Sequence, residues 1–209
     1  MTSHRPSRQV VPADALESLS RADPVMRGLI ERVGLFEPSF EPDLWWSLVD
    51  AIVSQQLSIK AAATIAGRIA ALAADGARPT PEAILATPDE ALRACGLSRA
   101  KTVYVKDLAA KWLDGTLEPD RFDAFSDEEV IEHLVRVKGI GRWTAEMVLM
   151  FTLGRPDVLP VDDLGLKVAV QEAYGLDARP DRAELERLGE PWRPWRSIAS
   201  FYLWRSRRV

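Results

Sequence analysis

The feature that most constrains the fold is a pair of closely spaced glycines, Gly139-Ile-Gly141, which separates two stretches of helical periodicity. Before it, Ser126-Asp-Glu-Glu129 has the Ser-x-x-Glu form of a helix capping box, and apolar residues follow at helical spacing up to Val137. After it, apolar residues recur on one face until Gly154 and Pro156 end the pattern. Because glycines free the backbone to turn, the pattern predicts a helix, a tight hairpin and a second helix.

Such a hairpin has a definite physical use. We expect that neither helix consumes its backbone N–H groups and that the second helix directs its N-terminus into the same space, which makes a site suited to a phosphate. Arg136, Lys138 and Arg142 add positive charge around it. It would hold a nucleic-acid backbone without reading sequence. The alternative is an ordinary corner between two helices whose basic residues are solvated.

The length and composition indicate a soluble globular protein. The chain has 209 residues, 47% of them hydrophobic and 28% charged, which is enough to bury a core in one domain or two small lobes. No apolar run approaches the roughly 20 residues of a membrane span. Residues 1–12 predict a flexible basic tail without the apolar segment of a secretory signal. We therefore expect a cytoplasmic or nuclear protein that is neither secreted nor bound to a membrane.

Charge is distributed unevenly along the chain. The net charge of −4 argues mildly against a nucleic-acid ligand, although only the contact face of such a protein must be basic. Basic residues concentrate at 136–142 and 193–208. The single cysteine, Cys95, excludes a disulfide framework and a four-cysteine iron–sulfur cluster, and two distant histidines make a zinc site unexpected.

Helical spacing predicts further helices, and no alternating strand pattern bounded by hairpin turns occurs. The expected helices span residues 13–20, 24–33, 44–53, 59–73 and 164–174, with short helices capped at Thr80 and Thr87, a longer one after Gly96 through Trp112, and a last one beginning at Pro194. We therefore expect an all-α protein.

Two motifs together carry a resemblance to a known family. Gly139-Ile-Gly-Arg-Trp-Thr-Ala145, followed by Leu153-Gly-Arg-Pro-Asp-Val-Leu-Pro-Val-Asp-Asp-Leu-Gly-Leu166, resembles the helix-hairpin-helix DNA glycosylase superfamily, and more narrowly its 3-methyladenine DNA glycosylase II branch. The resemblance extends from about residue 16 to 204. It implies a single all-α domain, 13–209, in two lobes (41–151, and 13–40 with 152–209), with the hairpin at the cleft and no iron–sulfur cluster.

The resemblance implies excision of alkylated purines, and the residues present suit that chemistry. Alkylation makes a purine cationic, so the enzyme needs an aromatic pocket that favours a cation and a carboxylate near the sugar. Asp162-Asp163 supplies two acids, which in one interpretation only cap the following helix. Counting back from Lys167 against the endonuclease-III-like branch would select Asp162. The alkylation-repair branch selects Asp163, which we assign as the catalytic acid.

The residue after Gly139-Ile-Gly-Arg142 discriminates between two reaction types. Bifunctional members of the superfamily place a Schiff-base lysine there, whereas this chain has Trp143. Without that amine no imine forms, so we expect a monofunctional hydrolase that leaves an abasic site and has no β-lyase activity. The resemblance places base contacts at Trp143, Met147, Trp204 and Trp46, although a tryptophan-rich helix is more often core.

By the same resemblance, Ser54-Gln-Gln-Leu-Ser58 lies where the superfamily has the element that plugs the duplex after a base is extruded. Gln56 is the candidate wedge; alternatively, both glutamines only satisfy backbone groups in a turn. Lys101 would reach a phosphate, or it is merely a solvated lysine at a helix start. The resemblance places DNA contacts at Gln56, Ser58, Lys101, Lys138, Gly139, Gly141, Arg142 and Thr144.

The expected function is therefore hydrolysis of the N-glycosidic bond of alkylated purines such as 3-methyladenine, the first step of base excision repair. The expected partner is double-stranded DNA with damaged bases, bound by a monomer. No cofactor is expected beyond a monovalent cation, Na⁺ or K⁺, that the resemblance places at the main-chain carbonyls of Val135, Val137 and Ile140. The alternatives are a non-catalytic helix-hairpin-helix DNA-binding module and a glycosylase for another class of lesion.

Overall fold

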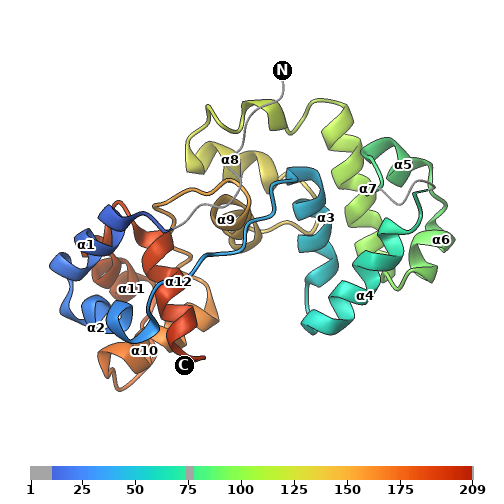
Figure 1. The fold of residues 1–209 in the computed structure, drawn as a ribbon. Helices are drawn as coiled ribbons and strands as arrows, with labels where there is room; N and C mark the ends of the chain where they lie inside the picture. Colours follow the sequence, from blue (N-terminus) through green and yellow to red (C-terminus); the bar gives the residue numbers. More distant parts are fainter. Residues whose placement is uncertain (1–10, 74–77, 209) are drawn as a thin grey trace. The chain divides into compact units, whose positions relative to one another are not determined.

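The structure, a computed structural model, describes residues 11–73 and 78–208. Within these ranges the chain forms twelve α-helices and two 3₁₀ helices, and no strand occurs there, so the all-α prediction is confirmed (Figure 1). Most of the basic tail predicted at 1–12 lies outside the described residues. In the described ranges no helix has the length and apolar character needed to cross a bilayer.

The chain divides into two compact units. Asp43–Val148 forms one, here called the hairpin unit; Met1–Pro42 together with Leu149–Val209 forms the other, here called the terminal unit. The prediction of one domain with lobes at 41–151 and at 13–40 with 152–209 stays a prediction.

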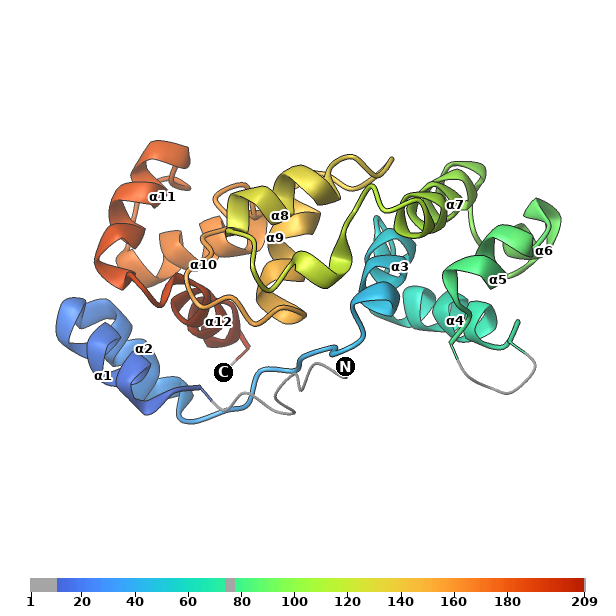
Figure 2. The ribbon, with the colours of Figure 1, turned by 90° about the horizontal axis from the view of Figure 1, so that it is seen from above.

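The hairpin unit is built around its longest helix, α7 (Arg99–Leu113), which contacts α3, α5 and α6 (Figure 2). The other helices of the unit, in chain order, are α3 Leu44–Ser54, α4 Ile59–Ala70, α5 Pro81–Ala86, α6 Asp89–Ala94, the 3₁₀ helix η1 Pro119–Arg121, α8 Asp127–Leu134 and the start of α9 Arg142–Phe151. Leu48 and Ile52 of α3 and Leu108 of α7 are fully buried. Burial of these apolar faces against α7 therefore holds the unit together.

The terminal unit packs helices from both ends of the chain against each other. Its elements are α1 Ala13–Ala22, α2 Pro24–Val33, α10 Leu164–Tyr174, α11 Arg182–Gly189, the 3₁₀ helix η2 Glu190–Trp192 and α12 Arg196–Ser206. Helix α12 contacts α2 and α10. The buried Asp23 carboxylate joins distant segments, because it accepts hydrogen bonds from Tyr174 Oη and from Trp192 Nε1 (3.0 Å). Burial and the hydrogen bond to Asp23 raise the pKa of Tyr174.

Most predicted helices are confirmed, including 24–33 and 164–174 with their bounds, but two helix starts are wrong. The Thr87 hydroxyl donates to Ala83 O (2.7 Å), in the last turn of α5, instead of capping the next helix, and α6 begins at Asp89 with no side-chain cap. The last helix begins at Arg196 instead of Pro194. The preceding residues form a turn in which Trp195 N donates to Trp192 O (2.7 Å).

Candidate functional site

The structure contains the predicted hairpin between α8 and α9. Ser126 and Glu129 form the capping box that starts α8. The backbone turns at Gly139, whose φ is +82°, and a Cβ there would lie 2.2 Å from Tyr104 Cδ2. A side chain at this position would meet both a disfavoured backbone conformation and an aromatic ring of α7, so the turn requires glycine.

The hairpin backbone is only partly open to a ligand, which corrects the expectation that all of its N–H groups are available. Lys138 N donates to Asp107 Oδ2 (2.8 Å), and Ile140 N donates to Val137 O (3.1 Å). Gln55 Nε2 donates to the carbonyl oxygen of Gly139 (2.7 Å). Among the hydrogen bonds of the described residues, none is donated by the amides of Gly139, Gly141 and Arg142. These three amides are the groups that could hold an anion.

The basic side chains of the hairpin differ in how far acids neutralise them. Arg142 forms a bidentate ion pair with Glu128 (2.8 and 2.7 Å) and a second ion pair with Glu146 (3.2 Å). The hydrogen bonds to Glu128 raise the pKa of Arg142. Lys138 remains 65% exposed, with its Nζ 3.8 Å from Asp107. Lys138 is therefore better placed than Arg142 to add charge to a bound phosphate.

Helix α9 brings Trp143 and Met147 onto one face, one helical turn apart. Trp143 is 44% exposed and Met147 is partly exposed. The Thr144 side chain is buried, so its predicted contact with DNA would have to come from its backbone. The fourth predicted base contact, Trp46, is also buried, and the Arg78 guanidinium carbon lies 5.2 Å from its ring centroid. In the hairpin unit, Trp46 is thus a core residue.

The predicted plug is a tight turn between α3 and α4. Gln56 lies at its tip, exposed and in the left-handed region with a φ of +56°. Ser58 caps α4 by accepting a hydrogen bond from Ala61 N (3.3 Å). Leu57 and Ile59, the latter 86% exposed, flank the tip and were not predicted as site residues. The sequence does contain a signal for Ile59, since it directly follows a capping serine at a helix start.

Lys101 does not lie on an open basic surface. Its Nζ donates to the backbone carbonyls of Val53 (2.7 Å) and Gln55 (2.6 Å), at the C-terminal end of α3. Burial lowers the pKa of Lys101. The ammonium group is therefore occupied by the protein, which gives no geometric support to the predicted phosphate contact.

In the terminal unit, the structure brings Asp163 and Trp204 together. Asp163 caps α10, and its Oδ1 accepts hydrogen bonds from Leu166 N (2.6 Å) and from Trp204 Nε1 (2.9 Å). Gly165 keeps this space open, because a Cβ there would lie 3.1 Å from Asp163 Oδ1. The neighbouring Asp162 is exposed and pairs with Arg182 (2.7 Å). Only Asp163 of the two acids is therefore placed against an aromatic side chain.

Two further aromatic residues surround Trp204 and were not predicted as site residues. The Phe151 ring stacks on Trp204 with a centroid distance of 6.0 Å and an interplanar angle of 22°. The Phe201 ring lies 6.1 Å from Trp204 and 5.1 Å from Phe151. Phe151 is the last residue of α9, and Phe201 lies one turn before Trp204 in α12. Only the fold brings these two helices' aromatic residues together. The candidate acid thus lies beside a cluster of three aromatic rings.

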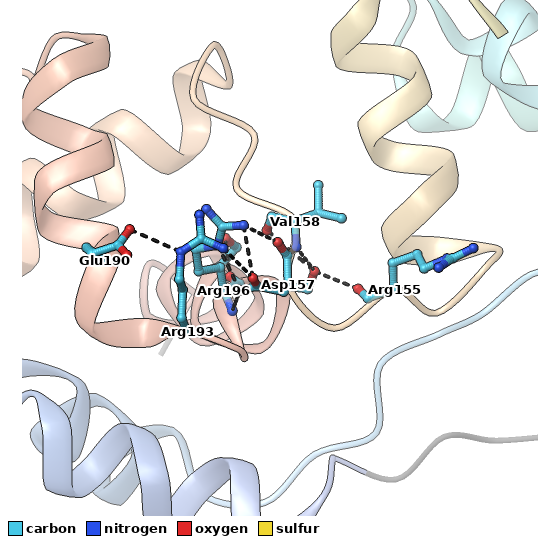
Figure 3. Close-up of polar contacts among 8 residues, drawn as sticks. Arg155, Asp157, Val158, Glu190, Arg193 and Arg196 are labelled. Atoms are coloured by element: carbon cyan, nitrogen blue, oxygen red, sulfur yellow. Dashed lines mark hydrogen bonds and ion pairs between the residues drawn. The ribbon is translucent and has the colours of Figure 1, made fainter. Parts of the chain in front are cut away.

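The segment that leads to Asp163 is tied to the start of α12. Figure 3 shows Arg193 and Arg196 converging on Asp157, with Arg193 Nη1 and Arg196 Nε each 2.7 Å from a carboxylate oxygen. Ser197 Oγ donates to Arg155 O (2.7 Å) and accepts from Val158 N (3.0 Å). Helix α12 therefore holds this segment at its beginning through Ser197 and at its end through Trp204.

Comparison with known proteins gives the same family as the motifs. The family described as "HhH-GPD superfamily base excision DNA repair protein" matches residues 49–194. The alkylbase DNA glycosidase-like protein mag2 of Schizosaccharomyces pombe is 36% identical over 91% of both chains. DNA-3-methyladenine glycosylase 1 of the same yeast is 35% identical over 91% of this chain and 86% of its own length.

Solved structures agree with these relatives. The S. pombe 3-methyladenine DNA glycosylase Mag1, in complex with abasic DNA, superposes with a TM-score of 0.85 at 35% identity, covering 94% of this chain and 98% of its own. A DNA-3-methyladenine glycosidase from Bacillus halodurans has a TM-score of 0.84 at 36% identity, covering 95% and 91%. The family match, the relatives and the hairpin lead to one conclusion: the chain belongs to the HhH-GPD superfamily of base excision DNA repair proteins.

Proposed function

We propose that this base excision repair protein is a monofunctional DNA glycosylase that hydrolyses the N-glycosidic bond of alkylated purines such as 3-methyladenine. The observation that carries the proposal is the Asp163 carboxylate held by the Trp204 indole beside Phe151 and Phe201. An acid next to aromatic rings suits a reaction in which a cationic base leaves and positive charge develops on the sugar. The relatives named above for 3-methyladenine support the same substrate class.

In the proposed mechanism, the aromatic side chains favour the cationic base and Asp163 acts on the sugar. Breaking the glycosidic bond releases a neutral base and leaves an oxocarbenium-like sugar, which the Asp163 carboxylate stabilises while water adds to it and gives up one proton to the solvent. The N–H groups of Leu166 and Trp204 both bind one oxygen of this carboxylate, which fixes its orientation. Trp143, Met147 and Trp204 are the proposed base contacts, whereas Trp46 is buried in the hairpin unit and is not proposed as one.

The hairpin and the plug turn are proposed to hold the DNA. The amides of Gly139, Gly141 and Arg142 and the exposed Lys138 would bind the phosphate backbone. Gln56, at the exposed tip of the plug turn, would fill the space that the extruded nucleotide leaves. Ser58 and Thr144 are proposed as further contacts.

The hairpin carbonyls have lone pairs that a monovalent cation could use. Val137 O accepts one hydrogen bond, from Ile140 N (3.1 Å), and a carbonyl has a second lone pair. Among the described residues, no backbone hydrogen bond to the carbonyls of Val135 and Ile140 occurs. We propose that these three carbonyls bind Na⁺ or K⁺, which would brace the hairpin.

The proposed reaction stops at the abasic site. Trp143 stands where a lyase of this superfamily would carry its Schiff-base lysine, so no imine with the sugar forms by that route. The test incubates the wild-type protein with methylated duplex and measures free 3-methyladenine and strand cleavage in parallel. Base release with an intact strand is expected. Binding without release would indicate a DNA-binding module, and cleavage of the strand together with release would contradict the monofunctional assignment.

A further inference from the structure

We infer that Lys101 is a positioning residue that holds the plug turn, residues 54–58, in the conformation that presents Gln56 to DNA. The inference rests on the proposed function, in which Gln56 enters the duplex during base extrusion. It assigns Lys101 a role different from the phosphate contact that the sequence predicts.

The first observation is where the ammonium group lies. Lys101 Nζ donates to Val53 O (2.7 Å) and Gln55 O (2.6 Å), carbonyls that end α3 and begin the turn. The last carbonyls of a helix lack intrahelical donors and carry partial negative charge, so a cation there satisfies them and fixes the chain's exit. The lowered pKa of Lys101, caused by burial, agrees with an ammonium group withdrawn from solvent.

The second observation is that the turn needs such support. Gln56 has a φ of +56°, a left-handed conformation that residues with a Cβ rarely adopt and that persists when the surroundings determine it. Hydrogen bonds fix the chain on both sides of Gln56. The Gln55 side chain donates to Gly139 O (2.7 Å), and Ser58 caps α4. Lys101, on α7, adds two hydrogen bonds to the start of the turn.

The third observation is that α7 also holds the hairpin. The Tyr104 ring packs against Gly139, and Asp107 Oδ2 accepts a hydrogen bond from Lys138 N (2.8 Å). Lys101, Tyr104 and Asp107 follow each other at three-residue intervals, so they lie along one side of the helix. Helix α7 therefore sets the spacing between the phosphate-binding hairpin and the wedge.

The test compares Lys101→Met with Lys106→Met, a control on the same helix whose Nζ pairs with Asp89 and does not contact the plug turn. Single-turnover base release is measured on two duplexes with the same alkylated purine, one opposite thymine and one opposite an abasic site. An unpaired base costs less to extrude, so a misplaced wedge slows release mainly from the paired lesion. Lys101→Met is expected to lose about 10-fold on the paired lesion and less than about 3-fold on the unpaired one.

Three results would overturn the inference. The first is unchanged release by Lys101→Met, and the second is an equal loss on both duplexes, which would indicate a general structural effect. The third is weaker binding to undamaged DNA with a salt slope reduced by about 0.9, the signature of a lost phosphate contact. Lys106→Met is expected to match the wild type on both duplexes.

A second variant keeps the test decisive if Lys101→Met folds poorly. Gln55→Leu removes the tie to Gly139 O and leaves α7 unchanged, and it is expected to show the same preference for the unpaired lesion. An equal loss on both duplexes would count against the inference here as well. Failure of the wild-type protein to release base from either duplex would instead overturn the proposed function.

Discussion

Two helix N-termini in this protein differ in where the anion that they favour comes from. Helix α9 follows Gly141, which has no side chain to cap it, and no described residue accepts a hydrogen bond from the amides of Gly139, Gly141 and Arg142. Helix α10 follows Asp163, whose carboxylate caps the helix through Leu166 N. A helix N-terminus favours an anion. In α9 that anion would come from DNA, whereas in α10 it is the candidate catalyst itself.

The charges around the two helix starts sharpen the contrast. Most basic side chains near them already pair with acids of the protein: Arg142 with Glu128, Arg182 with Asp162, and Arg193 and Arg196 with Asp157. Several arginines of the basic clusters are therefore neutralised within the fold. We infer that the phosphate contact depends on the hairpin amides and on Lys138 more than on the arginines.

Among substitutions that leave the candidate acid in place, the largest effect is expected at Gly139, where alanine should disrupt the anion site at α9. The added Cβ would lie 2.2 Å from Tyr104 Cδ2 at a φ of +82°. We expect Gly139→Ala to lower the free energy of unfolding by about 1–3 kcal/mol. Affinity for abasic duplex should fall about 10-fold or more if one or more amide contacts are lost. Urea denaturation and fluorescence anisotropy measure the two effects.

Gly141→Ala is the matched control, because nothing lies within 4 Å of a Cβ at that position. It should fold with stability close to that of the wild type. If Gly139→Ala proved as stable and as tightly binding as Gly141→Ala, the proposed strict need for glycine at the turn would be wrong.

A smaller effect is expected at the α10 site. Trp204→Phe keeps an aromatic ring beside Phe151 and removes the N–H that donates to Asp163 Oδ1 (2.9 Å). Loss of one hydrogen bond to a charged group should slow base release about 10-fold, with DNA affinity nearly unchanged. Trp195→Phe, at the other end of α12, serves as the control. Release by Trp204→Phe at the wild-type rate would show that the indole does not orient the acid.

The smallest effect distinguishes two basic residues of the hairpin. Lys138 is 65% exposed, whereas Glu128 neutralises Arg142. Lys138→Gln should reduce the slope of log affinity against log salt by about 0.9, the value for one phosphate contact. Arg142→Gln should leave the slope nearly unchanged. The opposite order would show that Arg142 leaves Glu128 to bind the phosphate.

Local patterns predicted the parts of the molecule that depend on neighbouring residues. The capping box at Ser126, the glycine turn and the helix at 164–174 are confirmed because each is specified within a few residues of chain. The family and the all-α fold are confirmed as well. The roles of the site residues stay predictions, since they depend on bound DNA.

Contacts between distant residues could not be predicted in this way. The sequence predicts that Lys101 is solvated or binds a phosphate. In the fold it instead donates to carbonyls 46 and 48 residues earlier in the chain. The sequence likewise did not predict a role for Asp107. Its carboxylate accepts a hydrogen bond from the Lys138 amide, which the motif alone leaves available to a ligand. The prediction at Thr87 was wrong because Thr-Pro suits a helix start, whereas the Thr87 hydroxyl donates to a carbonyl of the preceding helix.

The most direct test of the central claim separates binding from reaction in Asp163→Asn, with Asp162→Asn as the matched control. Asparagine still caps a helix and its oxygen still accepts a hydrogen bond from Trp204, so the fold and the hairpin should be preserved. We predict that Asp163→Asn binds abasic duplex with wild-type affinity but releases 3-methyladenine about 100-fold more slowly or worse, while Asp162→Asn releases it normally. Release by Asp163→Asn at the wild-type rate would contradict the assignment of Asp163 as the reacting acid.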